Sequence, residues 1–336
     1  MTDQITPVPT GTGVPAFGPP PPFDPELGAL LAGLAGQLPS SITPEMISAM
    51  REGALNPVTD DDLRRAGAFD VEERSVPGPD GAPDISLLIC RPTGVSAATP
   101  AIYHTHGGGM IIGDNRTGIL TMLDLAAEFG LAVVSVEYRL APEHPDPAPI
   151  EDCYAGLVWT AEHAAELGID PERIIVAGGS AGGGLAAGLA LLARDRGGPA
   201  LLAQILLYPM LDDRNESVSS RQMAGRGVWD STSNLTGWTA LLGDRRGGPD
   251  VSPYAAPARA TDVSGLPPAF IDVGTAETFR DEDVEYATRL WHAGGECELH
   301  VWPGAFHGFD MFAPEMMLSR DALAARPRWL ARILAR

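Results

Sequence analysis

The sequence predicts an α/β protein with a mostly parallel central sheet and helices on both faces. Short apolar, β-rich segments alternate with helical patterns from about residue 80 to the C-terminus, which is the order that βαβ units produce. The apolar segments are nearly continuous, as in strands that are covered on both faces. The chain has 336 residues, of which 44% are hydrophobic and 20% are charged. It is therefore long enough to bury a large core.

Seven segments are predicted as strands, because aliphatic and β-branched residues gather there between turn signals. They are residues 85–91, 101–106, 131–138, 173–179, 204–209, 269–274 and 297–302. Helical patterns lie between them, as parallel crossovers require. These helices are predicted at residues 119–129, 150–167, 181–194, 280–292 and 320–335.

Two parts of the chain do not follow this alternation of strands and helices. Residues 7–25 are rich in Pro and Gly and are expected to form an extended arm, which two short amphipathic helices follow by residue 50. Residues 211–250 are polar and Gly-rich, and we expect an insertion that packs with the N-terminal helices as a cap. The predicted division is an arm with cap helices (1–50), a first core part (51–210), a cap insertion (211–250) and a second core part (251–336).

Charge and cysteine content argue against several classes of partner. The formal charge is −21, from 44 acidic and 23 basic residues, and every basic residue is an arginine. Nucleic acid is therefore not expected as a partner. The three cysteines lie far apart and are expected to be buried free thiols, without a disulfide framework or a metal cluster. The first basic residue is Arg51, and no apolar run before it resembles a signal or a membrane span, so we expect a cytoplasmic protein that does not enter membranes.

The main chemical motif is Gly178-Gly179-Ser180-Ala181-Gly182, between a predicted strand and a predicted helix. A G-x-S-x-G sequence in this context is typical of a nucleophile elbow, in which a strained turn presents the serine at a helix N-terminus. Ser180 is therefore the candidate nucleophile. The alternative is a Gly-rich turn that binds phosphate, but the glycines do not keep the G-x-G-x-x-G spacing of a dinucleotide site.

Upstream, His106-Gly107-Gly108-Gly109 ends a predicted strand. Three successive residues without a Cβ let the main chain approach a ligand closely. The N–H groups of Gly107 and Gly108, with that of Ala181 after the nucleophile, are the candidate donors of an oxyanion hole.

A serine nucleophile needs a base, and His307 follows the last predicted strand, where the chain order serine, acid, histidine places it. The acid should precede it, after the strand at residues 269–274. Glu277 is the favoured candidate, and Asp281 or Asp272 could act in its place if the loop were arranged differently. No metal or cofactor is required by this chemistry.

These residues resemble the hormone-sensitive lipase-like carboxylesterases, also called bacterial esterase family IV. The matching segments are HGGG (106–109), YRLAPEHPDPAPIED (138–152), GGSAGG (178–183), ETFRDE (277–282) and HGF (307–309). The resemblance implies an α/β-hydrolase fold with a helical cap, a small-molecule ester as substrate and an acyl-enzyme mechanism. A homodimer through an edge strand or the last helix is compatible with it.

Two positions depart from the family pattern. The family usually has Asp before the nucleophile and Asp as the acid, where this chain has Gly179 and Glu277. A longer carboxylate can still reach an imidazole, and Gly179 is expected to widen the pocket. Arg139 and Glu143 have no catalytic role that the residues explain, and we interpret them as a structural clamp behind the site.

The sequence therefore predicts a serine carboxylesterase for short- to medium-chain esters. Cleavage of another acyl compound, an amide or a lactone, uses the same residues and stays an alternative. A ligand-binding module is the other alternative, since plant gibberellin receptors resemble this family but lack the catalytic histidine. His307 argues against that interpretation.

Overall fold

Eight strands form one sheet in the computed structural model, which describes residues 17–37, 39–52 and 58–336. The strand order is β1-β2-β4-β3-β5-β6-β7-β8. Strand β2 is antiparallel to both of its neighbours, and the other neighbouring pairs are parallel. The strands are β1 (Phe69–Val76), β2 (Ile85–Pro92), β3 (Thr99–Thr105), β4 (Ala132–Glu137), β5 (Ile169–Gly179), β6 (Leu201–Leu207), β7 (Ala269–Gly274) and β8 (Cys297–Trp302). The prediction of a mostly parallel sheet is confirmed.

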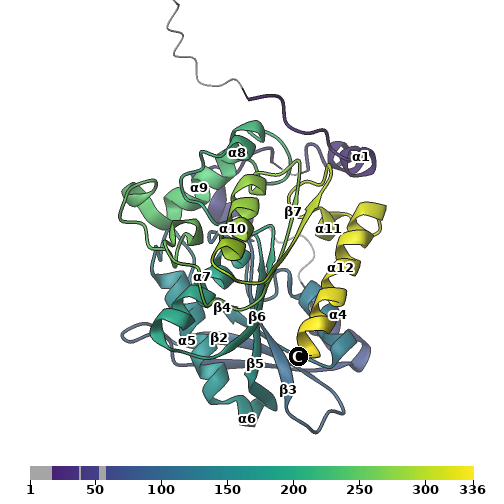
Figure 1. Cartoon of the computed structure of the whole chain (residues 1–336), viewed down its shortest axis with the longest axis vertical. Coiled ribbons are helices and arrows are strands. Elements are labelled where there is room, and N and C mark those ends of the chain that lie inside the picture. The colour runs from purple at the N-terminus through teal and green to yellow at the C-terminus, as the bar shows by residue number, and fades with distance from the viewer. Residues whose placement is uncertain (1–16, 38, 53–57) are drawn as a thin grey trace, which may run out of the picture.

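Helices cover both faces of this sheet (Figure 1). α5, α7 and α10 pack on one face, while α4 and α12 pack on the other. The helices are α1 (Pro25–Gly33), α2 (Ile47–Glu52), α3 (Asp60–Arg64), α4 (Ile119–Phe129), α5 (Ala148–Glu162), α6 (Ala164–Leu167), α7 (Ala181–Arg196), α8 (Val218–Gln222), α9 (Ser231–Leu242), α10 (Arg280–His292), α11 (Phe309–Phe312) and α12 (Met317–Leu334).

The sequence-based assignment was incomplete, and among the helices it did not predict α3, α8, α9 or α11. Strand β1 was not predicted, because its sequence FDVEERSV is charged and it lies half-exposed at the edge of the sheet. The helix predicted at 150–167 is two helices, α5 and α6, that meet at His163. The last helix begins at Met317 instead of residue 320. The arm predicted at 7–25 falls largely outside the described residues.

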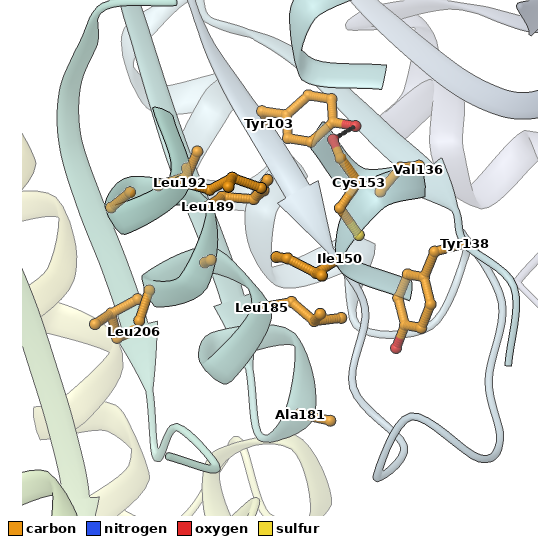
Figure 2. Packing of buried hydrophobic residues seen from close by; sticks show 14 of the residues in the cluster. Tyr103, Val136, Tyr138, Ile150, Cys153, Ala181, Leu185, Leu189, Leu192 and Leu206 are labelled. Atoms are coloured by element: carbon orange, nitrogen blue, oxygen red, sulfur yellow. Dashed lines mark hydrogen bonds between the residues drawn. The ribbon is translucent and has the colours of Figure 1, made fainter. Parts of the chain in front are cut away.

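The core on the α5 and α7 side is shown in Figure 2. Leu185, Leu189 and Leu192 of α7 belong to this core, and every residue of α7 from Ala181 to Ala193 is buried. The Tyr103 hydroxyl of β3 donates to the Cys153 carbonyl of α5 at 2.9 Å. A helix that is apolar all round fits this position, because the sheet and α5 cover it on several sides.

The N-terminal segments reach two different parts of the molecule. Leu27 of α1 packs with Phe306 and Phe309, on the loop and helix that follow β8. Further along, the Ile42 N–H donates to the Ser233 hydroxyl at 2.8 Å, and the Thr236 hydroxyl donates to the Ile42 carbonyl at 2.8 Å. The segment after α1 is therefore hydrogen-bonded, through Ile42, to α9 in residues 211–250.

All three cysteines are free thiols; Cys90 and Cys153 are buried, as predicted, whereas Cys297 is only half-buried. Within the described residues, no helix combines the length and the apolar character needed to cross a bilayer.

A buried ion-pair network joins α12 to the sheet. The Arg326 guanidinium is 1% exposed and contacts Asp272 of β7 at 2.9 Å and Asp310 of α11 at 2.6 Å. Asp310 also accepts the Tyr208 hydroxyl at 3.0 Å. Burial raises the pKa of Asp272, and the nearby guanidinium opposes that shift.

Replacing Arg326 with Met should destabilise the fold, because two carboxylates would remain buried without their cation. Breaking a buried pair costs about 3–5 kcal/mol, and the thermal midpoint should fall by roughly 5–10 °C. Arg328→Met, on an exposed part of the same helix, is the matched control in calorimetry and should stay within about 1 °C. Equal midpoints for the two variants would contradict this role.

His104 of β3 makes stability depend on pH. Its side chain is 1% exposed, its Nδ1 lies 2.9 Å from the Ser135 hydroxyl, and burial lowers its pKa from 6.5 to about 3. Between these two values the unfolded chain binds a proton that the folded chain excludes. The stabilising contribution is therefore present above pH 6.5 and is lost as the pH falls.

We expect the stability difference between wild type and His104→Gln to shrink by about 2 kcal/mol between pH 7.5 and pH 5. Urea unfolding at both pH values measures it. The exposed His292, replaced in the same way, provides the control for general effects of acid. A constant difference for His104→Gln would show that this histidine is not held neutral.

Candidate active site

Ser180 lies at the turn between β5 and α7, at the carboxyl edge of the parallel strands, where ligands bind in open α/β sheets. Its backbone has φ 58° and ψ −126°, a strained conformation for a residue with a side chain. The turn needs glycines because main chains meet there. A Cβ at Gly178 would lie 2.4 Å from the Gly182 carbonyl carbon, and one at Gly182 would lie 2.0 Å from the Thr105 oxygen. The predicted strand, turn and helix are all present.

His307 lies in the loop after β8 and joins two of the predicted residues. Its Nε2 is 2.9 Å from the Ser180 hydroxyl, and its Nδ1 is 3.1 and 3.0 Å from the two carboxylate oxygens of Glu277. The Phe279 N–H also donates to the Glu277 carboxylate at 3.0 Å. With the ring proton on Nδ1, facing the carboxylate, Nε2 is free to accept the Ser180 proton. The structure brings Ser180, Glu277 and His307 together in one hydrogen-bonded line.

The two alternative acids lie elsewhere. Asp272 is paired with Arg326 at 2.9 Å. Asp281 accepts the Ser219 N–H at 2.8 Å and the Arg280 Nε–H at 2.8 Å. Neither carboxylate has a hydrogen bond to His307 in the described structure, so Glu277 is the acid that the geometry favours.

Aromatic rings surround the His307 imidazole. The rings of Tyr208 and Phe279 meet it edge-on, with centroid distances of 5.0 and 5.2 Å, and Trp229 lies 6.4 Å away. Tyr208 also has φ 38°, in the left-handed region. These rings restrict the imidazole and shield it from water, so that its hydrogen bonds operate in a low-dielectric environment.

The HGGG loop passes directly beside the nucleophile. A Cβ on Gly107 would lie 3.0 Å from the Gly179 oxygen and 3.5 Å from the Ser180 Cβ. Gly108 has φ 112°, which favours glycine. Among the described residues, no hydrogen-bond acceptor is found for the N–H of Gly107 or of Gly108. Ala181, directly after Ser180, carries the first N–H of α7, which has no partner within the helix.

Several residues that hold this loop were not predicted. The Tyr138 hydroxyl donates to the His106 carbonyl at 2.8 Å. Arg51 of α2 donates to the carbonyls of Ile111 and Ala141, both at 2.7 Å. Such contacts join segments that are far apart in the sequence, and no local pattern marks them.

The interpretation of Arg139 and Glu143 as a structural clamp agrees with their contacts. Arg139 binds the fully buried Asp152 at 2.7 and 2.8 Å, and Glu143 binds Arg51 at 3.0 Å. Neither side chain lines the cavity at Ser180.

A cavity of about 260 Å³ opens beside Ser180 and His307. Its wall is mostly apolar, with a polar part formed by His104, Thr117 and Thr121. Apolar side chains come from the N-terminal segment, the loop after β3, α4, the 211–250 segment and α11; they include Ile42, Met50, Ile112, Met122, Val228, Trp229, Met311 and Phe312. An uncharged organic molecule fits such a site. Within the described residues, no three His, Cys, Asp or Glu side chains are grouped to hold a metal ion.

Similarity to known proteins covers most of the chain. A family model described as the alpha/beta hydrolase fold matches residues 102–311. Carboxylesterase NlhH of Mycobacterium tuberculosis is 41% identical over 251 residues, which are 72% of this chain and 76% of that protein. Carboxylic ester hydrolase LipN of the same organism is 39% identical, over 71% of this chain and 64% of its own length.

Solved structures give the same result. A bacterial heroin esterase superposes with a TM-score of 0.83 at 40% identity, covering 93% of this chain and 98% of the esterase. Esterase LipW from Mycobacterium marinum gives a TM-score of 0.82 at 35% identity, covering 93% and 96%. The chain therefore belongs to the α/β-hydrolase fold family, in the hormone-sensitive lipase-like group that its motifs indicated.

Proposed function

We propose that this protein is a serine carboxylesterase that hydrolyses esters of short- to medium-chain acids through an acyl-enzyme on Ser180. The observation that carries the proposal is the line of hydrogen bonds from Ser180 through His307 to Glu277, at the wall of an apolar cavity. Similarity to named carboxylesterases supports the choice of an ester as substrate.

In the first step the Ser180 oxygen attacks the ester carbonyl carbon while His307 Nε2 takes the hydroxyl proton. The Glu277 carboxylate holds the ring in the tautomer that can accept this proton and stabilises the imidazolium. Negative charge develops on the carbonyl oxygen. The N–H groups of Gly107, Gly108 and Ala181 are the donors that would stabilise it.

The intermediate then collapses. The bond to the alcohol oxygen breaks, His307 returns the proton to that oxygen, and the alcohol leaves the acyl group on Ser180. Water repeats the sequence: His307 takes its proton, its oxygen attacks the acyl carbon, and Ser180 regains its proton as the acid departs. The same steps would cleave an amide or a lactone. We propose an ester as the substrate because the similar proteins are named as carboxylic ester hydrolases.

The cap belongs to the same proposal. Residues 1–50 and 211–250 would form the cap, and residues 51–210 and 251–336 the core. Ile42 and Met50 from the first segment and Val228 and Trp229 from the second line the cavity, which supports this division. The cap would then determine which esters fit.

Further properties rest on the sequence and remain predictions. They are a cytoplasmic location and a small-molecule substrate without nucleic acid as a partner; a homodimer is compatible with the sequence. A non-catalytic binding module is disfavoured, because such a module has no need for a base hydrogen-bonded to a buried serine at 2.9 Å.

Ser180→Ala should reduce the hydrolysis of nitrophenyl esters by about a thousandfold or more, because the acyl-enzyme cannot form. Acetate, butyrate, octanoate and laurate esters serve as substrates, and circular dichroism checks that the variant is folded. The proposal would be wrong if the wild-type protein hydrolysed none of the four esters, or if the Ser180→Ala variant kept the wild-type rate.

Glu277→Gln should lower kcat by about a thousandfold or more, because an amide can hold the imidazole in the wrong tautomer. Glu277→Asp keeps the charge and should retain more activity than the Gln variant. Asp281→Asn is the matched control, since Asp281 does not contact His307, and should stay within about threefold of wild type. Equal losses in the Asp281 and Glu277 amide variants would reassign the acid.

A further inference from the structure

A second cavity adjoins the first one on the α4 and α12 face of the sheet. Its volume is about 520 Å³, and α4, α11, α12 and the segment before α3 contribute its walls. Gly118, Thr121 and Met311 line both cavities. Helices α4 and α12 lie side by side, which places this space between them (Figure 1). The two cavities therefore share one boundary.

The boundary has little that would block a ligand. Gly118 has no side chain and adopts φ 77° before the first residue of α4. Met311 is 50% exposed, and a thioether side chain with three rotatable bonds moves aside readily. On the far wall, Pro327 lies inside α12 and cannot donate a hydrogen bond to the Leu323 carbonyl, which weakens the helix there.

The walls of the second cavity suit an uncharged chain. Apolar side chains make up much of its surface; they are Val58, Leu120, Leu125, Met311, Pro314, Leu323 and Pro327. The Arg326 guanidinium and the Asp310 carboxylate also line this cavity, but they are paired with each other at 2.6 Å. Arg65 and Asp124 also form an ion pair. Glu128 is exposed to solvent. Because these charged groups pair with one another or face solvent, the surface that remains for a ligand to contact is mostly apolar.

Size supplies the second argument. The cavity at Ser180 holds about 260 Å³, below the range of about 300–1,000 Å³ that is usual for small-molecule sites. A short acyl or alcohol group fits there, but a longer alkyl chain needs more space. The cavity between α4 and α12 provides it.

We propose that the cavity between α4 and α12 is a second substrate subsite, which receives the distal part of an unbranched alkyl chain of the ester. The chain passes Gly118, Thr121 and Met311 on its way from the carbonyl at Ser180. This inference rests on the proposed esterase function. It names as substrate class esters with a linear alkyl chain longer than the first cavity accommodates.

Leu323→Trp tests this, because Leu323 lines the second cavity and not the first. An indole would occupy the subsite. Each methylene displaced from apolar surroundings lowers kcat/KM about fourfold, from about 0.8 kcal/mol per methylene. We expect a loss of about tenfold or more on a long-chain ester and less than twofold on nitrophenyl acetate. Arg328→Trp, on an exposed position of the same helix, is the matched control and should leave both rates unchanged.

Two series of substrates show which side of the ester enters. Nitrophenyl octanoate carries its chain on the acyl side, and octyl acetate carries it on the alcohol side. A selective loss on either substrate supports the subsite and assigns its side. Equal chain-length profiles for Leu323→Trp and wild type on both series overturn it. Wild-type protein that fails on nitrophenyl acetate itself would instead overturn the proposed function.

A second measurement does not depend on how the variant folds. Nitrophenyl phosphonates react with a serine nucleophile: the Ser180 oxygen bonds to phosphorus and nitrophenolate leaves. Wild-type protein would be crystallised after reaction with an octylphosphonate and, separately, with a methylphosphonate that carries an octyloxy group. An octyl chain between α4 and α12 in either adduct is the expected result. Chains directed toward Ile42 and Met50 in both adducts would overturn the inference.

Discussion

Close contact between main chains at the carboxyl ends of β3 and β5 determines the site. The start of α7 rests on the end of β3, where a Cβ at Gly182 would lie 2.0 Å from the Thr105 oxygen. The loop that follows β3 then passes within contact distance of Ser180 at Gly107. Because no side chain fits between these segments, the nucleophile lies in direct contact with the main chain of the loop at Gly107. The glycines of both motifs are needed for this approach before any chemistry is considered.

The base depends on a different constraint, which comes from the C-terminal helix. Arg326 of α12 holds Asp310, which lies three residues after His307, and Asp310 holds the hydroxyl of Tyr208. The Tyr208 ring in turn lies edge-on to the imidazole at 5.0 Å. One buried cation thus fixes the loop that carries the base and an aromatic wall beside it. The same helix bounds the second cavity, so α12 is both a support for His307 and a wall of the space available to substrate.

The sequence predicted the features that local patterns encode. Seven strands, the elbow at Ser180 and the glycines of the loop were found because apolar runs and small residues mark them. Strand β1 was missed because its exposed edge position permits charged residues. The sequence left three candidate carboxylates for the acid that orients His307. Only the folded structure shows that Glu277 reaches the imidazole, whereas Asp272 pairs with Arg326. Arg326 contacts Asp310 and Asp272, which lie 16 and 54 residues away in the sequence. No local sequence pattern predicts such tertiary contacts.

The two departures from the family pattern can now be explained in physical terms. The longer side chain of Glu277 reaches Nδ1 with both oxygens, at 3.0 and 3.1 Å, and the Phe279 N–H holds it in place. At Gly179, a Cβ would lie 3.3 Å from the Tyr208 ring, tighter than ordinary contact. A larger residue there would press on the ring that packs against His307. Gly179 lines the cavity, and the absence of a side chain there leaves room for the Tyr208 ring. The residue before the nucleophile and the base are therefore coupled through one aromatic side chain.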